Sequence, residues 1–377
     1  MDVVKLNQSW AGTLNKITVI KIIDSLLGPL IAPLVERLFP PEDRTSENIN
    51  AVLIIRPGGI GDAVLLIPTI ALLKEKYPHA VIEVLTEKRN SGVFALSPDV
   101  SSVFHYDAPA EFLATLQRTY DVVIDSEQWH RLSAIVARLT RAPMTIGFAT
   151  NERKKMFTHP VPYSHDEYEM HSFMNLLTPL IGTITRDIDM PFLTIPPDVT
   201  DKVKPLLMPV LSNKMVALFP GGSIAERQWG SGRFHKTAKL LSDQGYGIVA
   251  VGGNDDVRAG QEIVSGLSNA LNLCGKLSLP ETAALLKESS LLIAGDSGIM
   301  HVGYGLGIKI VALFGPGREL KWAPRSSRVA VINKHLSCSP CTTFGYTPKC
   351  KNSAECMKLI TAEEVFAQAM NLLESTS

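Results

Sequence analysis

Residues 51–77 read AVLIIRPGGIGDAVLLIPTIALLKEKY, which places a short apolar run, a glycine-rich turn and a longer apolar segment in direct succession. The run Ala51–Ile55 has the length of a strand that is buried on both faces. The turn Gly58–Asp62 separates it from Ala63–Tyr77, whose apolar residues recur with helical spacing. A buried strand followed by a helix is the repeating unit of a parallel sheet. This stretch therefore predicts an α/β fold.

The same alternation of short apolar runs and helical segments recurs along the chain. In the first half we predict further strands at Val81–Leu85 and Tyr120–Asp125. The alternation weakens between Gly147 and Pro197, where we expect loops, a helix around Met170–Leu180 and an interdomain linker. A second series follows, with strands at Met215–Phe219, Gly247–Val251, Leu291–Ala294 and Ile308–Phe314 and with helices at Phe234–Gln244, Leu279–Glu288 and Ala362–Leu373. The sequence therefore predicts two Rossmann-like, doubly wound domains.

Length and composition agree with two globular domains. The chain has 377 residues, more than one compact domain usually holds, and 45% of them are apolar and 20% charged. We place an N-terminal extension and linker at residues 1–48, an N-terminal domain at 49–197 and a C-terminal domain with its terminal helix at 198–377. Basic and acidic residues both number 37, so the overall charge does not favour nucleic acid as a partner. Few cysteines and no secretory pattern predict a cytoplasmic enzyme.

The extension contains an apolar segment, Ile17–Phe39, with helical spacing. Lys21, Asp24 and two prolines lie within it, which argues against a membrane-spanning helix. Two interpretations remain open. The helix either lies on a membrane surface or packs against the body of the protein.

The turn after the first strand carries the first candidate site residues. Its glycines allow close approach of a ligand to the amides that open a helix, so Arg56, Gly59 and Gly61 are acceptor-side candidates. A Rossmann dinucleotide fingerprint is the competing interpretation. Val64 stands where its third glycine belongs, although Glu83 lies near the distance of a ribose-binding acid.

Asp62 at the start of the helix is the candidate catalytic residue of this turn. A carboxylate there either stabilises the helix N-terminus or serves as a general base in a cleft.

Two turns of the second domain have the composition of a nucleotide-sugar site. After the strand that ends at Phe219, a glycine turn precedes a serine and an arginine, which could bind a diphosphate. After the strand that ends at Ala294, a small-residue turn opens a helix and presents unpaired amides, and its acid could accept hydrogen bonds from sugar hydroxyls. The candidate donor-binding residues are Gly222, Ser223, Arg227, Asp255, Asp296, Ser297, Gly298 and His301. His301 could equally be a core histidine.

Four of the five cysteines, Cys338, Cys341, Cys350 and Cys356, lie close together near the C-terminus. The Cys-x2-Cys pair fits a structural zinc site, whereas the second pair is spaced more widely than usual. Structural zinc, disulfides and free thiols all remain open, and we assign these cysteines no catalytic role.

From about Ala51 to Leu373 the chain resembles glycosyltransferase family 9, the lipopolysaccharide heptosyltransferase family, which has the GT-B fold of two Rossmann-like domains facing each other across a cleft. The segments that carry the resemblance are Val52–Arg56 with Gly61 and Asp62, Tyr120–Asp125, Ile146–Phe148, Phe219–Ser223 with Arg227 and Trp229, Asp296–Gly298 with His301, and Ala312–Pro316. A lysine is familiar in the family where this chain has Arg227.

The resemblance implies an inverting transferase without a catalytic metal or cofactor. It implies a nucleotide-diphosphate sugar as donor, with ADP-heptose favoured, and a lipid-linked glycan of the lipopolysaccharide type as acceptor. Asp62 would be the base, and the donor-binding candidates would surround the nucleotide sugar. We therefore expect a peripheral enzyme on the inner face of the cytoplasmic membrane. The alternatives are a nucleotide-sugar epimerase of similar fold and a binding protein without activity.

Overall fold

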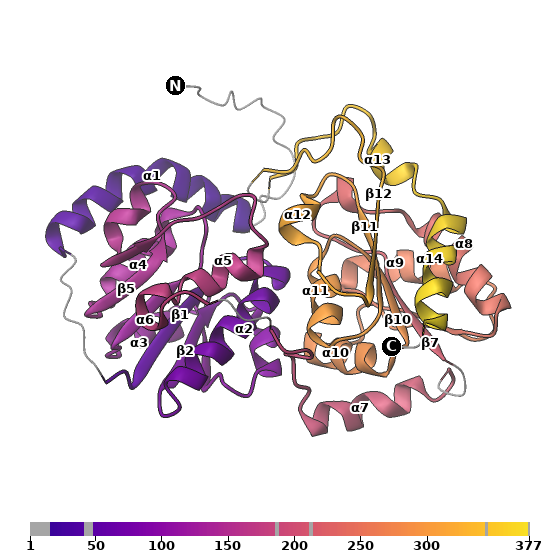
Figure 1. Cartoon of the computed structure of the whole chain (residues 1–377), viewed down its shortest axis with the longest axis horizontal. Coiled ribbons are helices and arrows are strands. Elements are labelled where there is room, and N and C mark those ends of the chain that lie inside the picture. The colour runs from indigo at the N-terminus through magenta and orange to yellow at the C-terminus, as the bar shows by residue number, and fades with distance from the viewer. Residues whose placement is uncertain (1–15, 41–47, 185–187, 211–213, 344–345, 376–377) are drawn as a thin grey trace.

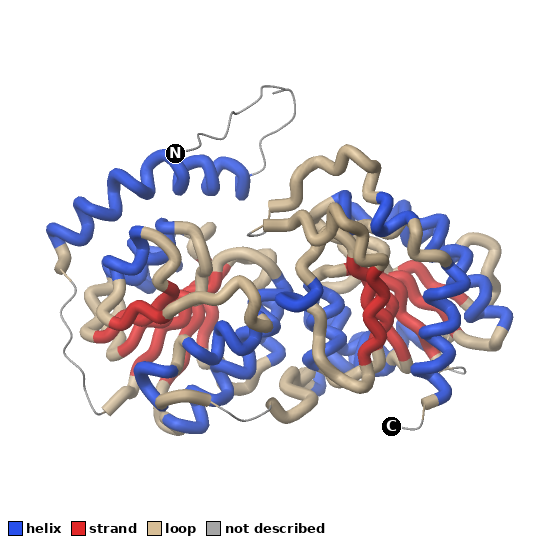
Figure 2. The backbone as a smooth tube through the Cα atoms, turned by 45° about the horizontal axis from the view of Figure 1, so that its top comes forward, coloured by secondary structure: helices blue, strands red, loops and turns tan. Residues whose placement is uncertain are grey.

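The computed structural model describes residues 16–40, 48–184, 188–210, 214–343 and 346–375, without the side chains of several residues before 31. It contains two parallel six-stranded sheets, one in each half of the chain (Figure 1). In both halves the strands lie between layers of helices (Figure 2). Most of the linker expected at Pro40–Asn48 lies outside the described residues.

The N-terminal sheet has the strand order β3-β2-β1-β4-β5-β6. Its strands are β1 (Ala51–Arg56), β2 (Val81–Thr86), β3 (Ser102–His105), β4 (Val122–Asp125), β5 (Met144–Phe148) and β6 (His159–Val161). Its helices are α2 (Ile60–Lys76), α3 (Pro109–Gln117), α4 (Arg131–Leu139), α5 (Glu169–Asn175) and α6 (Thr178–Ile181), with the short 3-10 helices η1 (Ser91–Leu96) and η2 (Glu152–Met156).

The C-terminal sheet has the order β12-β11-β10-β7-β8-β9, which repeats the connectivity of the first sheet. Its strands are β7 (Met215–Phe219), β8 (Gly247–Ala250), β9 (Ala270–Asn272), β10 (Leu291–Gly295), β11 (Ile310–Phe314) and β12 (Val329–Asn333). Its helices are α7 (Pro197–Leu207), α8 (Ser231–Asp243), α9 (Val257–Val264), α10 (Leu279–Glu288), α11 (Gly298–Gly305), α12 (Glu319–Trp322), α13 (Glu355–Lys358) and α14 (Ala362–Glu374), with η3 (Ala225–Arg227) and η4 (Asn254–Asp256).

These topologies confirm the predicted α/β class and the two doubly wound sheets. The predicted strands in the centre of each sheet agree with the structure to within about two residues, because they are apolar runs buried on both faces. The edge strands β3, β6, β9 and β12 were not predicted, because they are short or only partly buried and carry weak apolar runs. The buried strand β5 was not predicted either, because Thr145 and Gly147 interrupt its apolar run. The helix expected at Met170–Leu180 is divided into α5 and α6.

Each sheet has one switch point, where the order in which successive strands are added reverses its direction across the sheet. In the first sheet β1 lies between β2 and β4, and in the second β7 lies between β8 and β10. Helices that follow the two strands of a switch point leave the sheet on opposite faces and open a crevice at the carboxyl ends. The folds therefore place the turns after β1, β4, β7 and β10 where ligands bind in such sheets.

The two domains meet where α2 packs against α11, with the first turns of the two helices in contact. A Cβ atom at Gly61 would lie 2.7 Å from Cδ2 of His301, and a Cβ atom at Gly298 would lie 2.6 Å from Cβ of Ile60. Both positions are too close for any side chain. Gly61 and Gly298 therefore let the two helix N-termini approach each other.

The N-terminal helix α1 (Lys16–Leu38) confirms the helix expected at Ile17–Phe39 and lies along α4 and η2. Asp24 joins α1 to α4, because its Oδ1 accepts hydrogen bonds from the amides of Arg131 (2.6 Å) and Leu132 (2.7 Å). His130, the residue before α4, supplies no capping side chain. Asp24 thus caps a helix from a distant part of the chain.

One face of α1 remains uncovered. Leu27, Leu34 and Leu38 are 45%, 56% and 61% exposed, and their spacing puts them on one side of the helix. The adjacent side of the helix, about a quarter turn away, buries Asp24, Ala32 and Val35. Among the described residues, no helix is long and apolar enough to cross a membrane. The helix therefore does pack on the body of the protein, as one interpretation held, and still presents an apolar row to solvent.

Replacing Asp24 by Ala should destabilise the N-terminal domain by about 1–2 kcal/mol, the usual loss for a helix cap. Although burial opposes it, hydrogen bonds from His130 and from the two amides hold the pKa of Asp24 below its usual value. The Asp24 contribution is therefore present above the ordinary Asp pKa and is lost as the pH falls through the lowered value.

Thermal unfolding and amide exchange of α4 measure this effect. Asp24→Asn keeps the accepting oxygen and should retain most of the stability, and Asp198→Ala, at an exposed pair with Lys202, is the control. Equal stability of Asp24→Ala and the wild type would contradict the capping role.

Candidate functional site

The candidate residues from both domains come together at the α2–α11 contact. Asp62 lies in the first turn of α2, and Asp296 directly precedes the turn that opens α11. Gly61, the neighbour of Asp62, lies against His301 of α11 across the domain boundary. Burial raises the pKa of Asp296, and the charge of Asp62 adds to this rise. The structure therefore brings the two acids proposed from sequence into one site.

Asp62 has a defined orientation. Its side chain is 22% exposed, and its Oδ1 accepts a hydrogen bond of 2.9 Å from Nε2 of Gln128. The nearest nitrogen of Arg56 lies 3.9 Å from the same oxygen. The carboxylate is thus held by a side chain that follows β4, instead of bonding the amides of its own helix, so capping does not account for its orientation.

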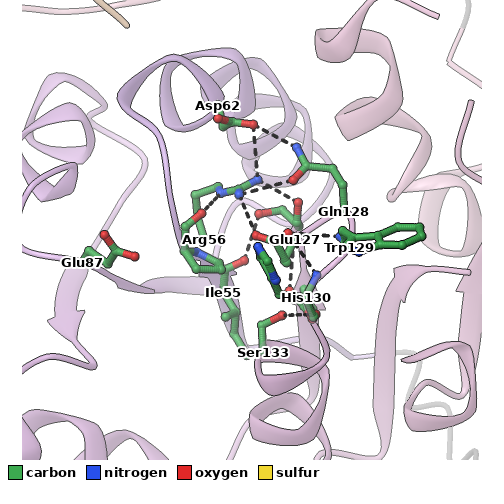
Figure 3. A network of polar contacts seen from close by, with 12 residues as sticks. Ile55, Arg56, Asp62, Glu87, Glu127, Gln128, Trp129, His130 and Ser133 are labelled. Carbon is green, nitrogen blue, oxygen red and sulfur yellow. Dashed lines mark hydrogen bonds and ion pairs between the residues drawn. The ribbon is translucent and has the colours of Figure 1, made fainter. Parts of the chain in front are cut away.

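Arg56 is the centre of the network in Figure 3. Its side chain is 2% exposed and donates to the carbonyl of Ser126 (2.8 Å), to Oε2 of Glu127 (3.2 Å) and to Oε1 of Gln128 (3.4 Å). Burial lowers its pKa, yet the surrounding acids, Asp62 first, raise it above the ordinary value. Arg56, expected on the acceptor side, is therefore buried and fixes the loop after β4, including Gln128.

Glu127 secures the other side of this loop. Its Oε1 accepts from the amides of Trp129 (3.0 Å) and His130 (3.3 Å), which keeps the chain turned toward α4. Despite full burial, the charge of Arg56 lowers the pKa of Glu127 below its usual value. Trp129 leaves this loop with its side chain 39% exposed. The loop is held at its base by these hydrogen bonds and carries an accessible ring.

A second acid, Glu169 of α5, lies behind Asp62. Gln128 Nε2 also donates to its Oε1 at 2.7 Å, and Nζ of Lys321 lies 2.6 Å from its Oε2. Burial raises the pKa of Glu169 to about 7, with Lys321 opposing the rise and Asp62 adding to it. Asp62 and Glu169 therefore share one amide group between them.

On the C-terminal side, Arg227 and Asp296 form an ion pair with 2.8 Å between NH1 and Oδ2. Asp296 is 7% exposed, and burial raises its pKa although Arg227 opposes the rise. The two residues that we expected to contact different parts of a donor thus contact each other. A diphosphate arriving beside Arg227 would exchange or share this pairing.

Two buried nitrogen atoms at this site have no hydrogen-bond partner in the described part of the chain. They are Nε of Arg227 itself and Nδ1 of His301. Burial lowers the pKa of His301 to about 3, so its ring is neutral at neutral pH. Its ring also lies edge-on to Trp322, with 6.3 Å between centroids. Unpaired buried polar atoms are costly unless a ligand satisfies them, so this is the strongest local indication of a ligand site.

The remaining predicted donor residues lie around the same edge. Ser297 caps α11 by accepting from the amide of Met300 (3.5 Å), and Gly298 opens the helix. Ser223 is exposed in the turn after β7. Gly222 in the same turn has a φ of 151° that favours glycine.

Asp255 is exposed after β8. Its neighbour Asp256 is the acid that faces this turn, because a Cβ atom at Gly221 would lie 2.4 Å from the Oδ1 of Asp256.

Glu83, the acid that kept a dinucleotide interpretation open, is fully engaged elsewhere. Its oxygens accept from Arg118 (2.7 Å) and from the hydroxyl of Tyr120 (2.9 Å), and the side chain is 5% exposed. A ribose could not replace these partners without breaking the ion pair to the half-exposed Arg118 and the hydrogen bond to Tyr120.

All five cysteines are free thiols. Burial raises the pKa values of Cys341 and Cys356, and the charges of the neighbouring cysteines add to this. Within the described ranges, however, no three metal-ligating side chains lie close enough to hold an ion. The arrangement does not display a metal site, and the structural zinc stays a prediction from spacing. The segment does contact the site, since Arg227 donates to Thr342 at 3.5 Å.

Two cavities of about 350 and 240 Å³ lie near the amino-terminal ends of β10 and β11, and both are lined in part by Lys287 and Arg328. They do not belong to the site, because Asp296 lies at the carboxyl end of β10.

Sequence reasoning missed Gln128, Glu169 and Lys321. The position of Gln128 directly after the strand that ends at Asp125 is a signal that could have identified it, because the end of a strand at the switch point faces the site. Glu169 and Lys321 lie in segments that the sequence pattern left as loops or did not assign, and only the domain contact brings them to the site.

Comparisons with known proteins agree with this architecture. The model of glycosyltransferase family 9 (heptosyltransferase) matches residues 110–351, which is more than half of the chain. Lipopolysaccharide heptosyltransferase 3 of Escherichia coli is 25% identical over 293 residues, covering 71% of this chain and 84% of that protein.

Two solved structures have the same fold. The glycosyltransferase family 9 protein of Veillonella parvula superposes with a TM-score of 0.73 at 21% identity, covering 87% of this chain and 99% of that chain. The ADP-heptose lipopolysaccharide heptosyltransferase II of E. coli superposes with a TM-score of 0.71 at 22% identity, covering 86% and 98%. The chain therefore belongs to glycosyltransferase family 9 and is a lipopolysaccharide heptosyltransferase-like glycosyltransferase with the GT-B fold.

Proposed function

We propose that this glycosyltransferase moves a heptose from ADP-heptose to a glycan acceptor of the lipopolysaccharide type, with inversion at the anomeric carbon. The observation that carries the proposal is the position of Asp62, which lies in the N-terminal domain directly opposite Arg227, Asp296 and His301 in the C-terminal domain. The names of the E. coli relatives supply the sugar, the nucleotide and the acceptor class.

The proposed reaction is a single displacement. Asp62 accepts the proton of an acceptor hydroxyl while that oxygen attacks the anomeric carbon of the donor. The bond from this carbon to the diphosphate oxygen breaks on the opposite face, and its electron pair leaves with ADP. A base on one domain and a leaving-group site on the other are the arrangement that such an in-line displacement requires.

The negative charge that develops on the diphosphate would be stabilised by Arg227 and by the amides at the start of α11. The unpartnered Nε of Arg227 is a donor available to a phosphate oxygen. The neutral ring of His301 could donate from either nitrogen, depending on its tautomer. These groups let the proposed step proceed without assigning a metal ion to it.

We further propose that α1 attaches the protein peripherally to the inner face of the cytoplasmic membrane, where a lipid-linked acceptor would be found. The row Leu27, Leu34 and Leu38 can enter a lipid surface while the adjacent face of the helix stays bound to α4. One such helix would give reversible attachment.

Asp62→Asn should abolish transfer and leave donor binding intact. Asn keeps an oxygen for the Gln128 hydrogen bond, so the geometry is preserved while the proton has no acceptor, and the rate should fall by about 10²–10⁴. A transfer assay beside a calorimetric titration with ADP-heptose measures both. Asp198→Asn, at an exposed pair with Lys202, is the matched control. Full activity of Asp62→Asn would exclude the base role.

Arg227→Ala and Asp296→Ala should each weaken ADP and ADP-heptose binding by about tenfold or more, because a charge-assisted contact contributes about 1.5–3 kcal/mol. Arg258→Ala, a change at a 93% exposed arginine of the same domain, should bind normally. Unchanged affinity in both site variants would place the donor elsewhere.

Incubation with donor alone separates the alternative functions, since an epimerase would convert it, whereas a transferase or a binding protein would not.

The triple variant Leu27→Ser, Leu34→Ser, Leu38→Ser should lose membrane attachment while keeping Asp24 and the α4 contact. Partition to anionic vesicles should fall by about tenfold or more, since burying even one leucine contributes about 1.5–3 kcal/mol. Leu206→Ser with Leu359→Ser, which are 44% and 45% exposed outside α1, serves as the control. Equal partition of wild type and triple variant would show that α1 is only a packing element.

A further inference from the structure

A buried ion pair joins the two domains next to the proposed base. Lys321 of α12 belongs to the C-terminal domain, and its Nζ contacts Oε2 of Glu169 (2.6 Å), the carbonyl of Ser164 (2.7 Å) and Oγ of Ser172 (3.0 Å). All three partners belong to the N-terminal domain. An ammonium group has three hydrogen atoms to donate, so the N-terminal domain satisfies all of them.

The pair is buried on both sides of the boundary. Glu169 is 0% exposed and Lys321 is 3% exposed. Nζ of Lys321 also lies 4.3 Å from the centroid of the Tyr163 ring. A buried charge without its partner is strongly unfavourable. These contacts can therefore exist only while the domains are closed, because separation removes the partners of both groups at once.

The same pair reaches Asp62 through one amide group. Nε2 of Gln128 donates one hydrogen to Oε1 of Glu169 (2.7 Å) and the other to Oδ1 of Asp62 (2.9 Å). Both hydrogens of the amide are thereby committed, which leaves Gln128 a single orientation. Without the ion pair to Lys321, the acceptor at residue 169 is no longer held in place, and the amide could turn away from Asp62.

The next residue along α12 contacts the donor side. The ring of Trp322 lies edge-on to His301, whose Nδ1 is one of the unpartnered atoms of the site. One short helix therefore touches both the group behind the base and a residue of the donor site.

We propose that Glu169 and Lys321 are positioning residues, whose ion pair forms on domain closure and orients Gln128 so that its amide holds Asp62 for proton transfer. The proposal rests on the proposed role of Asp62 as the base. It makes the productive orientation of the base conditional on the closed arrangement of the two domains.

Because the ion pair requires a charged Glu169, the rate of transfer should depend on pH. Burial raises the pKa of this carboxyl to about 7, and the groups that face it are Lys321, Asp62, Tyr163 and Arg56. Below pH 7 the carboxyl takes up a proton and the ion pair loses its negative partner. Transfer should therefore increase as the pH rises through about 7 in the wild type. This increase should be absent from Glu169→Gln, which forms no ion pair at any pH.

The first measurement is independent of transfer. Small-angle X-ray scattering of the full-length protein compares the wild type with Lys321→Met, with Glu169→Gln and with the double variant, which leaves no unpaired charge and guards against misfolding. We expect the wild type to fit the closed arrangement and all three variants to have a larger radius of gyration. Lys334→Met is the matched control, because Lys334 and Glu364 form an ion pair of the same length, 2.6 Å, within the C-terminal domain.

The second measurement is the transfer reaction with ADP-heptose. We expect kcat of the three variants to fall by about tenfold or more, in line with the loss of one well-placed catalytic contact, while the donor KM changes by less than about twofold. Unchanged scattering and unchanged kcat in folded variants would overturn the proposal, as would an equal loss in Lys334→Met. If the wild type itself transfers nothing, the proposed function fails, and the scattering result still decides whether the ion pair holds the domains together.

Discussion

The structure depends on the close approach of two helix N-termini, those of α2 and α11, across the domain boundary. Each start of a helix carries unpaired amides and a partial positive charge, so two of them facing each other repel unless negative groups lie between them. Asp62 and Asp296 are such groups, and a diphosphate would be a third. Gly61 and Gly298 make the approach possible, because any side chain there would overlap His301 or Ile60. The same contact that joins the domains therefore creates an anion site between them.

Concentrating acids at this edge has an electrostatic cost, and the structure offsets it by pairing most of them with cations. Asp296 pairs with Arg227, Glu169 with Lys321 and Glu127 with Arg56. Among these described acids, Asp62 is the one whose nearest cationic nitrogen is as far as 3.9 Å, and its hydrogen bond comes from a neutral amide. This difference in partners is the physical reason to assign the base role to Asp62.

The loop after β4 connects this chemistry to the surface of the molecule. Gln128 at its centre contacts Asp62, whereas the amides of Arg131 and Leu132 just beyond it are capped by Asp24 of α1. The apolar row of α1 lies on the adjacent side of that helix. If the apolar row of α1 meets a membrane, the start of α4 would therefore connect that surface to Gln128, the residue that orients the base.

The sequence by itself determined the class of fold, most central strands of the two sheets and the turns that carry Asp62, Arg227 and Asp296. Buried parallel strands and glycine turns are local patterns, which is why the sequence shows them. It did not determine the edge strands, whose apolar runs are too short, or the burial of Arg56. Gln128, Glu169 and Lys321 acquire their roles only in the tertiary structure, since they come from three separate segments. Local sequence reports the preferences of neighbouring residues, whereas an ion pair between residues 169 and 321 depends on how two domains pack.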